Sequence, residues 1–257
     1  MNNKFYAVMV ICNRDIDDSI SFKSLKRFDF VNIIVCDNST ETNGNSRCEG
    51  ANVRYIDMGG NSGLAKAYNR ALDLIGASDG VICLFDDDTS VPEDYFEKID
   101  AFLRENDADI VLPTVYDEVG IMSPCKINGV LTSRVADTGE LDGESISAIN
   151  SGMAVKSRVF SDYRYNEEYF LDFIDHAFIR DMKALSKSIK ICPALELKQS
   201  FSANDRDVKR ARARFEIFKR DYSLFCKGSG SVKDRLLGRL YLLKRSFNIN
   251  ILYRLGR

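Results

Sequence analysis

Asp86, Asp87 and Asp88 directly follow the apolar run 81–85, and three adjacent carboxylates repel one another unless a positive charge lies nearby. Because alternate residues of an extended segment point the same way, Asp86 and Asp88 can share one ligand. A hard divalent cation, Mg²⁺ or Mn²⁺, prefers such oxygen ligands. The alternative is that the three acids are solvated and cap a helix that begins near Ser90.

The segment 61–69 reads Asn-Ser-Gly-Leu-Ala-Lys-Ala-Tyr-Asn and is a second candidate site. Gly63 at the start of a helix would let a phosphate approach free backbone N–H groups, and Lys66 would add a positive charge one turn later. The segment matches neither the Walker loop nor the dinucleotide-binding fingerprint. The alternative, which this segment alone favours, is a helix cap at Ser62 with a packing glycine.

Two further carboxylates, Asp172 and Asp175, lie among aromatic and aliphatic residues in the segment 169–180. If the segment is helical, their spacing of three places them on one face. A carboxylate in apolar surroundings is a candidate general base. His176, the only histidine of the chain, has no second histidine with which to form a zinc site. We therefore interpret His176 as a neighbour that tunes Asp175.

The elements that must position these residues form an α/β pattern. Short apolar runs alternate with helical patterns at 5–12, 32–36, 53–56, 81–85 and 110–112. The runs are continuous, which is typical of strands covered on both faces in a mostly parallel sheet. Helices are predicted at 62–75 and from a capping box at 90–93. We therefore predict an α/β fold in which ligands bind beyond the carboxyl ends of the strands.

The rest of the chain divides into three parts. From Thr114 to Ile149 the periodicity fades, which predicts loops and short strands over one edge of the sheet, where a substrate can be held. A second ordered block spans 148–193. A basic tail follows, and the Gly-Ser-Gly-Ser sequence at 228–231 divides it into two helical stretches.

Charge is distributed unevenly along the 257 residues, although the net charge is only −2. Residues 205–257 contain 15 basic and 5 acidic residues, a net +10, whereas the first 204 contain 21 basic and 33 acidic, a net −12. Such asymmetry indicates an interaction surface on the tail, and the alternative is a solvated helical face. A hydrophobic content of 45% argues against disorder or a fibrous repeat.

Cysteine usage favours a reducing cytoplasm. The chain has seven cysteines and no Cys-x-x-Cys pair, and Cys12, Cys36 and Cys83 lie in apolar runs where we expect them to be buried. The first residues show no signal-peptide pattern, and no stretch approaches the roughly 20 apolar residues needed to span a bilayer. We therefore expect a soluble or peripheral protein.

Six motifs, taken in order, resemble family 2 glycosyltransferases of the GT-A fold, a Rossmann-like arrangement, and specifically the rhamnosyltransferase-like bacterial enzymes of surface-polysaccharide assembly. The motifs are Val10–Arg14, Ile34–Ser39, Asn61–Asn69, Phe85–Thr89 with Pro92-Glu93, Asn150–Gly152 and Phe170–Asp175. The resemblance covers about residues 5–225. It implies a GT-A catalytic domain at 1–204, with a nucleotide-binding part at about 1–112 and an acceptor-side part at about 113–204, followed by a basic helical region at 205–257.

The resemblance implies inverting transfer from a UDP- or dTDP-sugar to an acceptor hydroxyl. The residues implied to bind the nucleotide sugar are Asn13, Asp37, Asn61, Gly63, Lys66, Asn69, Asp86 and Asp87. Asp88 and Asp86 would ligate a divalent cation, and Asp175 would be the general base. The residues implied to line the sugar or acceptor cleft are Ser151, Gly152 and Asp172. Relatives often supply a late histidine to the metal, but the segment 195–200 has none, so fewer protein ligands hold the metal or Lys198 supplies positive charge.

The tail is predicted to place the enzyme at a membrane. Apolar residues at helical spacing in 232–247 alternate with lysines and arginines, a pattern typical of a helix on an anionic membrane surface. Lipid-linked glycan acceptors would be found there, at the inner face of the cytoplasmic membrane. The alternatives are packing on the catalytic domain or on a second copy in a homodimer. No nucleic-acid partner is expected, since no groove with interleaved aromatic residues accompanies the charge.

The predicted function is therefore metal-assisted glycosyl transfer in bacterial O-antigen or capsule biosynthesis. Two alternatives stay open. One is a sugar nucleotidyltransferase that makes the activated sugar and releases pyrophosphate. The other is a catalytically silent GT-A domain that acts as a scaffold in an assembly complex.

Overall fold

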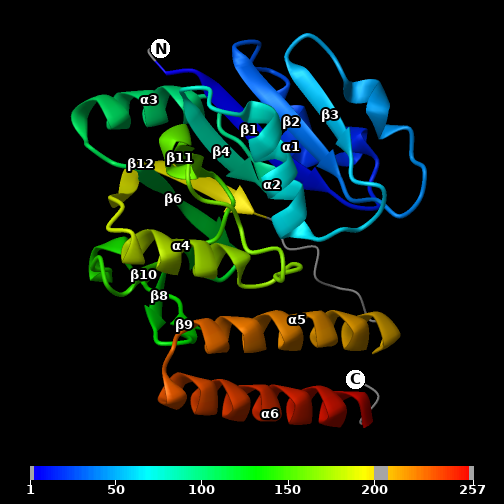
Figure 1. Ribbon diagram of the computed structural model, residues 1–257, viewed down its shortest axis with the longest axis vertical. Helices are drawn as coiled ribbons and strands as arrows, with labels where there is room; N and C mark the ends of the chain where they lie inside the picture. Colours follow the sequence, from blue (N-terminus) through cyan, green and yellow to red (C-terminus); the bar gives the residue numbers. More distant parts are fainter. Residues whose placement is uncertain (1–2, 200–207, 255–257) are drawn as a thin grey trace.

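The computed structural model of the protein describes residues 3–199 and 208–254. In this part of the chain, nine strands form a central sheet in the order β3-β2-β1-β4-β11-β6-β12-β5, with β7 paired to β6 (Figure 1). The strands are β1 (Phe5–Ile11), β2 (Val31–Asp37), β3 (Val53–Asp57), β4 (Val81–Phe85), β5 (Thr89–Ser90), β6 (Ile110–Asp117), β7 (Gly120–Ser123), β11 (Met153–Lys156) and β12 (Ile189–Gln199). Strands β3, β2, β1 and β4 pair in parallel, as predicted. Strand β11 is antiparallel to both β4 and β6, which the apolar pattern did not indicate.

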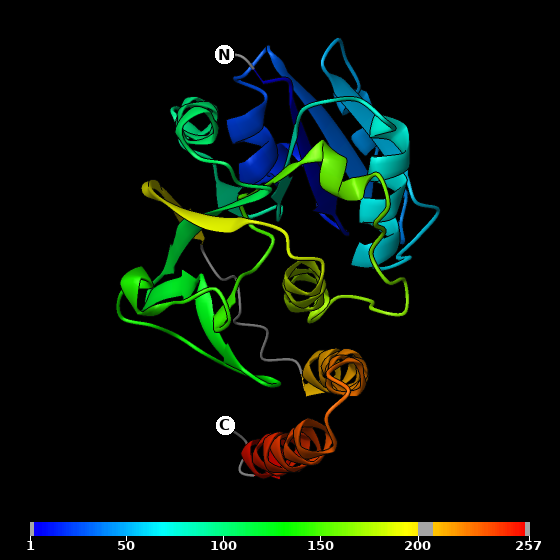
Figure 2. The same ribbon diagram turned by 60° about the vertical axis from the view of Figure 1, so that its left-hand side comes forward.

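Helices cover both faces of this sheet (Figure 2). Their bounds are α1 (Ile20–Leu25), α2 (Leu64–Ile75), α3 (Tyr95–Glu105) and α4 (Ile174–Ala184), with short 3-10 helices η1 (Ile16–Asp18), η2 (Asn45–Cys48), η3 (Thr138–Glu140) and η4 (Ser157–Phe160). Successive side chains of a strand point to opposite faces. Phe5, Ala7 and Met9 accordingly share a core with α1 and α3, whereas Tyr6 and Val8 share a core with α2 and α4. Polar groups of the sheet are therefore left mainly at the strand ends.

The predicted capping box at 90–93 does not form. Thr89 and Ser90 instead make the short strand β5, and α3 begins at Tyr95 after the N-cap Asp94. Tertiary pairing overrides the local pattern here, because β5 pairs antiparallel with the end of β12, with Gln199 opposite Thr89. This pairing brings the end of β12 beside the three acids that follow β4.

The segment 114–149 contains short strands, as predicted. Strand β6 continues to Asp117 and turns back as β7, and a separate three-stranded sheet has the order β10-β8-β9 within the described residues. Its strands are β8 (Cys125–Asn128), β9 (Leu131–Ser133) and β10 (Ile146–Ser147). In Figure 1 this small sheet lies between the central sheet and the C-terminal helices.

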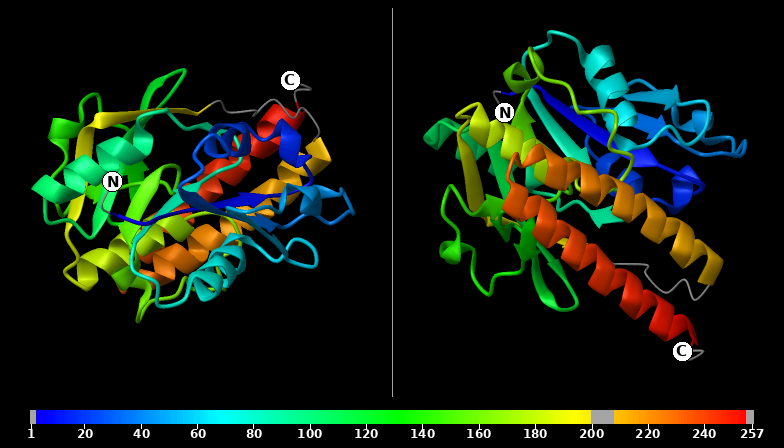
Figure 3. Two further views of the ribbon diagram at one scale, coloured as in Figure 1. Left: turned by 90° about the horizontal axis from the view of Figure 1, so that it is seen from above. Right: turned by 60° about the horizontal axis from the view of Figure 1, so that its bottom comes forward.

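Two long antiparallel helices, α5 (Val208–Gly228) and α6 (Val232–Arg254), lie side by side below the sheet (Figures 1 and 3). The break between them falls within the predicted 228–231 segment. Helix α5 buries aromatic residues in the core that α2 and α4 share, namely Phe215, Phe218, Tyr222 and Phe225. Helix α6 lies outside α5 and exposes the apolar residues predicted for its face, namely Val232, Leu236, Leu240, Leu243 and Phe247. The predicted boundary between residues 204 and 205 lies outside the described residues.

All seven cysteines are free thiols. Cys36 and Cys83 are buried, as predicted, but Cys12 is exposed because β1 ends one residue before it. Among the residues that the structure describes, no helix is long and apolar enough to cross a bilayer.

Candidate active site

Asp86 and Asp88 converge on the side-chain amide of Gln199. Both aspartates follow β4, at the carboxyl end of that strand. Gln199 Nε2 donates to Oδ2 of Asp86 at 3.2 Å and to Oδ1 of Asp88 at 3.0 Å. The hydroxyl of Ser151 donates to the same oxygen of Asp86. The two carboxylates therefore face one point, as the alternation of an extended segment predicted.

Gln199 is the residue at this site that the sequence did not identify. The prediction considered Lys198 in the same segment, but Lys198 is exposed on the opposite side of β12, so that part of the prediction is wrong. Gln199 is only 8% exposed and follows the inward positions of Leu195 and Leu197. This alternation was a usable signal, because residues two apart on a strand share a face. Ser200, the last residue of the predicted segment, lies outside the described residues.

Negative charge is concentrated around Asp86. Burial raises the pKa of Asp86 to about 6, although the hydrogen bonds from Ser151 and Gln199 favour its ionised form. The charges of Asp88 and Asp175 raise the pKa further, so Asp175 lies within electrostatic reach of the pair. Two carboxylates that face one point, with a third within electrostatic reach, favour the binding of a cation or of a proton.

Asp87 belongs to a different environment from its two neighbours. Its carboxylate pairs with Arg14, with 3.4 Å between Nε and Oδ2, and burial raises its pKa. Its carbonyl oxygen accepts hydrogen bonds from the Ser19 hydroxyl at 2.8 Å and the Ser21 N–H at 3.3 Å. Asp87 thus anchors the segment that leads into α1, and a direct role in binding the nucleotide sugar stays a prediction for it.

Asp175 lies in the first turn of α4, on a helix start that α5 holds in place. The residue before the helix, Phe173, has a φ of 60°, a left-handed conformation that side chains other than glycine rarely adopt. Its ring packs on three aromatic rings of α5, with centroid distances of 5.5 Å to Phe218, 4.8 Å to Tyr222 and 5.1 Å to Phe225. Strained backbone of this kind persists only where surrounding packing enforces it.

The loop before α4 is also fixed through its backbone, by Asp221 of α5. Asp221 is fully buried and accepts the N–H groups of three consecutive residues, Phe170 at 3.2 Å, Leu171 at 2.8 Å and Asp172 at 2.9 Å. The carboxylate of Asp172 pairs with Arg214 of α5, with 2.7 Å between NH2 and Oδ1. Asp172 therefore ties the loop to α5, and this role differs from the cleft position expected for it.

His176 is a structural neighbour of Asp175. Its Nδ1 lies 2.8 Å from the hydroxyl of Ser147, and its ring packs near those of Phe173 and Phe225. The N–H of His176 donates to Oδ1 of Asp175 at 2.8 Å, which orients that carboxylate at the start of the helix. This arrangement agrees with the interpretation of His176 as a neighbour.

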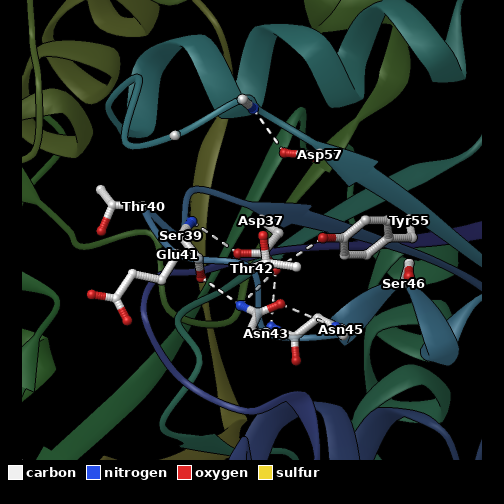
Figure 4. Close-up of a pocket in the computed structure, with 13 residues that line it drawn as sticks. Asp37, Ser39, Thr40, Glu41, Thr42, Asn43, Asn45, Ser46, Tyr55 and Asp57 are labelled. Carbon is white, nitrogen blue, oxygen red and sulfur yellow. Dashed lines mark hydrogen bonds between the residues drawn. The ribbon is translucent and has the colours of Figure 1, made fainter.

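A polar cavity of about 290 Å³ opens beside Asp37, at the end of β2 (Figure 4). Oδ2 of Asp37 accepts hydrogen bonds from Asn43 at 3.2 Å, Asn45 at 2.9 Å and the Tyr55 hydroxyl at 3.0 Å. Oδ1 accepts the N–H of Ser39 at 2.9 Å, and the Ser39 side chain also hydrogen-bonds this carboxylate. Burial alone would raise the pKa of Asp37, but these hydrogen bonds lower it below its ordinary value.

Two predicted asparagines shape the loops around this cavity. Oδ1 of Asn13 accepts from the N–H and the hydroxyl of Thr40, at 2.9 and 3.1 Å, and so holds the loop that lines the cavity. Oδ1 of Asn61 accepts from the N–H of Gly63 at 3.3 Å. Both asparagines are exposed, and a direct role in binding the nucleotide stays a prediction for them.

The start of α2 is closed by protein, which confirms the packing glycine of the alternative, but the N-cap is Gly63 and the predicted cap at Ser62 does not form. The first helical N–H, of Leu64, donates to the carbonyl oxygen of Phe170 at 2.6 Å, and a Cβ on Gly63 would lie 2.9 Å from the Phe170 ring. Gly63 is therefore needed for close packing and leaves that N–H unavailable to a phosphate. Lys66 is exposed. Asn69 is buried and bonds the backbone N–H and carbonyl of Tyr165, both at 2.9 Å, which corrects its assignment to the nucleotide.

Ser151 and Gly152 support the site from within the protein. Ser151 is fully buried, and its hydroxyl bonds Asp86 rather than facing a cleft. Gly152 has a φ of +74°, and a Cβ there would overlap Cδ1 of Leu197. The expectation that these two residues line the sugar cleft is therefore corrected. Gly152 permits the close approach of β12.

Buried polar atoms without partners gather near the carboxylates. Within the described residues, Oε1 of Gln199, the hydroxyl of Tyr68 and Oδ1 of Asn150 have no hydrogen-bond partner. Burial raises the pKa of Tyr68, and the charges of Asp86 and Asp175 add to this effect, so its hydroxyl lies near both. Unsatisfied groups of this kind commonly mark the place of a ligand, ion or water. No cluster of three or more His, Cys, Asp or Glu side chains suited to a metal occurs in residues 3–199 or 208–254.

Comparison with known proteins identifies the family. The profile of the family described as Glycosyl transferase family 2 matches residues 7–129. Over 217 residues the chain is 25% identical to the dTDP-rhamnosyl transferase RfbF of Shigella flexneri, covering 81% of this chain and 72% of that protein.

Solved structures show the same fold. Mannosyltransferase PcManGT from Pyrobaculum calidifontis, in complex with GDP-Man and Mn²⁺, aligns with a TM-score of 0.61 at 12% identity, over 94% of this chain and 70% of that one. TarS 1–349 of S. aureus, in complex with UDP-GlcNAc, aligns with a TM-score of 0.53 at 16% identity, over 86% of this chain and 66% of that one. Residues 7–129 are therefore a glycosyltransferase family 2 domain, and the chain is a glycosyltransferase with the GT-A fold.

Proposed function

We propose that the protein transfers a sugar, with inversion, from a nucleotide-diphosphate sugar to an acceptor hydroxyl, assisted by a divalent cation. The observation that carries this proposal is the division of carboxylates at one site between separate elements. Asp86 and Asp88 follow β4, whereas Asp175 stands on α4, within electrostatic reach of Asp86. One group can therefore serve the leaving diphosphate and the other the incoming hydroxyl.

The nucleoside would occupy the cavity beside Asp37, whose lining of hydroxyl, amide and carboxylate groups suits the polar edge of a base. Strand β1 lies between β2 and β4, so Asp37 and Asp86 are two strand spacings, or about 10 Å, apart along one edge of the sheet. This separation allows one nucleotide to reach from the cavity to the acidic pair.

Asp175 would take the proton of the acceptor hydroxyl as the new glycosidic bond forms, since a sugar hydroxyl is a poor nucleophile until a positioned base accepts its proton. Asp86 and Asp88 would hold Mg²⁺ or Mn²⁺, which supplies charge neutralisation for the diphosphate as it leaves. The oxygen-rich donor set fits a hard cation. In this scheme Ser151 keeps Asp86 oriented toward the shared point.

The test replaces Asp175 by Asn, which keeps the size of the side chain but removes its basicity. We expect transfer to fall by about 100-fold or more, the usual contribution of a general base, with unchanged affinity for dTDP or UDP by calorimetry. Asp181→Asn on the same helix is the matched control for an Asp-to-Asn change, since Asp181 bonds the Tyr163 hydroxyl at 3.0 Å instead of facing Asp86. Full turnover in the Asp175 variant would contradict the proposed base. Conversion of a free sugar phosphate with release of pyrophosphate would instead favour the nucleotidyltransferase.

The proposed donor and pathway follow the Shigella relative, whose name specifies a dTDP-rhamnosyl transferase. We propose a dTDP- or UDP-sugar as donor and a lipid-linked acceptor in surface-polysaccharide assembly. A panel of nucleotide sugars tested by thermal shift addresses the donor, because a ligand that binds only the folded state raises the melting temperature. Equal shifts with GDP- and dTDP-sugars would argue against a pyrimidine nucleotide.

We propose that α6 docks on the inner face of the cytoplasmic membrane. Its exposed apolar residues include Val232 at 73%, Leu243 at 67% and Phe247 at 65% exposure. Lysines and arginines are exposed on the same helix, namely Lys233, Arg235, Arg239 and Lys244. Removal of 231–257 should abolish sedimentation with phosphatidylglycerol vesicles and leave binding to neutral vesicles unchanged. Retained sedimentation would contradict the proposal, and dimer dissociation on truncation would favour a second copy.

A further inference from the structure

We propose that Gln199 supplies a third protein ligand, through its amide oxygen, to the cation that Asp86 and Asp88 hold. This inference rests on the proposed function, because it concerns the same cation. Gln199 occupies the part of the sequence in which the resemblance led us to expect a histidine. It is 8% exposed, and its Oε1 is a buried acceptor without a partner in the described part of the chain.

The unpartnered oxygen and the bonded nitrogen belong to one amide group. Rotation by about 180° about the last side-chain torsion, which is broad and nearly two-fold for glutamine, exchanges Oε1 with Nε2. In the present orientation Nε2 donates to Asp86 and Asp88, so the amide stands in for a cation as the partner of both carboxylates. With a cation bound, the two carboxylates no longer need an N–H donor.

The separations between these atoms match a coordination shell. Ligands around Mg²⁺ lie at about 2.0–2.1 Å, so adjacent ligands of an octahedron are about 3 Å apart. The amide nitrogen of Gln199 lies 3.2 Å from the Asp86 oxygen and 3.0 Å from the Asp88 oxygen. The exchanged Oε1 would therefore stand about one octahedral edge from each carboxylate. An amide carbonyl is also an oxygen ligand, which hard cations prefer.

Leaving a buried acceptor unsatisfied is unfavourable, because the group has lost its hydrogen bonds to water. The pairing of β12 with β5 nevertheless places the amide beside the two carboxylates, since Gln199 lies opposite Thr89, the residue that follows Asp88. Ligation of a cation would satisfy the oxygen and relieve the repulsion between the carboxylates in one step. The neighbouring Lys198 is exposed on the other side of the strand and takes no part.

The first experiment titrates the full-length protein with MnCl₂ alone and follows free Mn²⁺ by electron paramagnetic resonance. We expect Gln199→Leu to weaken Mn²⁺ binding by about 10-fold to 100-fold, as loss of supporting ligands does elsewhere, and Asp88→Asn to weaken it at least as much. Lys198→Ala should bind as the wild type does. Unchanged binding in Gln199→Leu together with loss in Asp88→Asn overturns the role of Gln199 and leaves the cation site standing. If the wild type binds no Mn²⁺, the proposed cation site itself is overturned.

The second experiment stays informative if Gln199→Leu folds poorly. Gln199→His places a nitrogen ligand at the same position, and we expect its Mn²⁺ complex to show nitrogen modulation in electron spin echo spectra that the wild type lacks. Mn²⁺ binding without that modulation would put residue 199 outside the coordination shell and would overturn the proposal. Neither readout depends on turnover, so failure of the glycosyl-transfer proposal is detected separately.

Discussion

Replacement of Asp221 by Ala tests whether α5 is part of the catalytic machinery. The fully buried carboxylate accepts three consecutive backbone N–H groups from the loop that leads to Asp175 and pairs with Arg220 at 3.1 Å. A hydrogen bond to a charged group contributes about 1.5–3 kcal/mol, so three of them set an upper bound near 9 kcal/mol. Water can replace part of this, because Leu171 is 40% exposed. We therefore expect a loss of about 3–5 kcal/mol, as for other broken buried charge interactions.

The assay compares thermal unfolding with single-turnover kinetics. A loss of this size lowers the melting temperature by about 10 °C, since one kcal/mol corresponds to about 2–4 °C for a chain of this length. We expect turnover to fall in Asp221→Ala while nucleotide affinity stays unchanged, because the loop positions Asp175 and not the cavity beside Asp37. For Asp221→Asn, which keeps one acceptor oxygen, we expect a melting temperature and a turnover between those of the wild type and of Asp221→Ala.

Glu216→Ala is the matched control on the same helix. Glu216 forms an exposed ion pair with Lys219 at 3.3 Å, and such pairs contribute less than about 1 kcal/mol. A melting temperature of Asp221→Ala equal to that of this control would refute the reasoning. So would wild-type turnover in Asp221→Ala, since the loop would then hold Asp175 without α5.

Three further predictions concern residues whose roles the structure changed or sharpened. Because hydrogen bonds lower the pKa of Asp37, its stabilising contribution is fully present above about pH 4 and is lost as the pH falls from there through its pKa in the folded protein. Urea unfolding should separate wild type from Asp37→Asn at pH 7, and the difference in unfolding free energy should shrink as the pH falls below about 4. A difference that widens on acidification would contradict this. Gly152→Ala should destabilise by about 1–3 kcal/mol beyond Gly230→Ala, since both glycines have φ near +70° but only Gly152 has a neighbour that a Cβ would overlap; equal melting temperatures would refute the clash. Asn69→Leu should lower stability by about 2–3 kcal/mol through its lost bonds to Tyr165 without altering nucleotide affinity, and weaker nucleotide binding at unchanged stability would restore the earlier assignment.

Local pattern was sufficient for the parts of the site that lie at strand ends. The apolar runs predicted β1, β2 and β4, which pair in parallel. Because residues that follow parallel strands meet at one edge of the sheet, Asp37, Asp86 and Asp88 could be predicted from the sequence. The aromatic surroundings of Asp175 likewise drew attention to a residue that lies near Asp86.

Contacts between distant segments could not be predicted in the same way. Gln199 reaches Asp88 across 111 positions, because β12 pairs with a two-residue strand that local pattern assigned to a helix cap. Asp221 binds a loop about 50 residues earlier, and nothing in the composition of α5 marks it among the charged residues. Glycine and asparagine motifs were ambiguous for another reason. The same residue types serve phosphate binding and close packing, and only the neighbours of Gly63 and Asn69 separate the two.

The contacts of the two C-terminal helices also change what the +10 charge of the tail means. Part of that charge is used inside the protein, because Arg214 pairs with Asp172 and Arg220 pairs with Asp221. Helix α5 thus holds the loop before Asp175, and a chain ending at residue 204 would lack the contacts that position the proposed base. The exposed lysines and arginines of α6 lie beside apolar side chains that are exposed in the described part of the chain, and this is the surface that we propose binds the membrane. The proposed functional division therefore falls at the 228–231 turn, where we expect a truncation to separate membrane binding from catalysis.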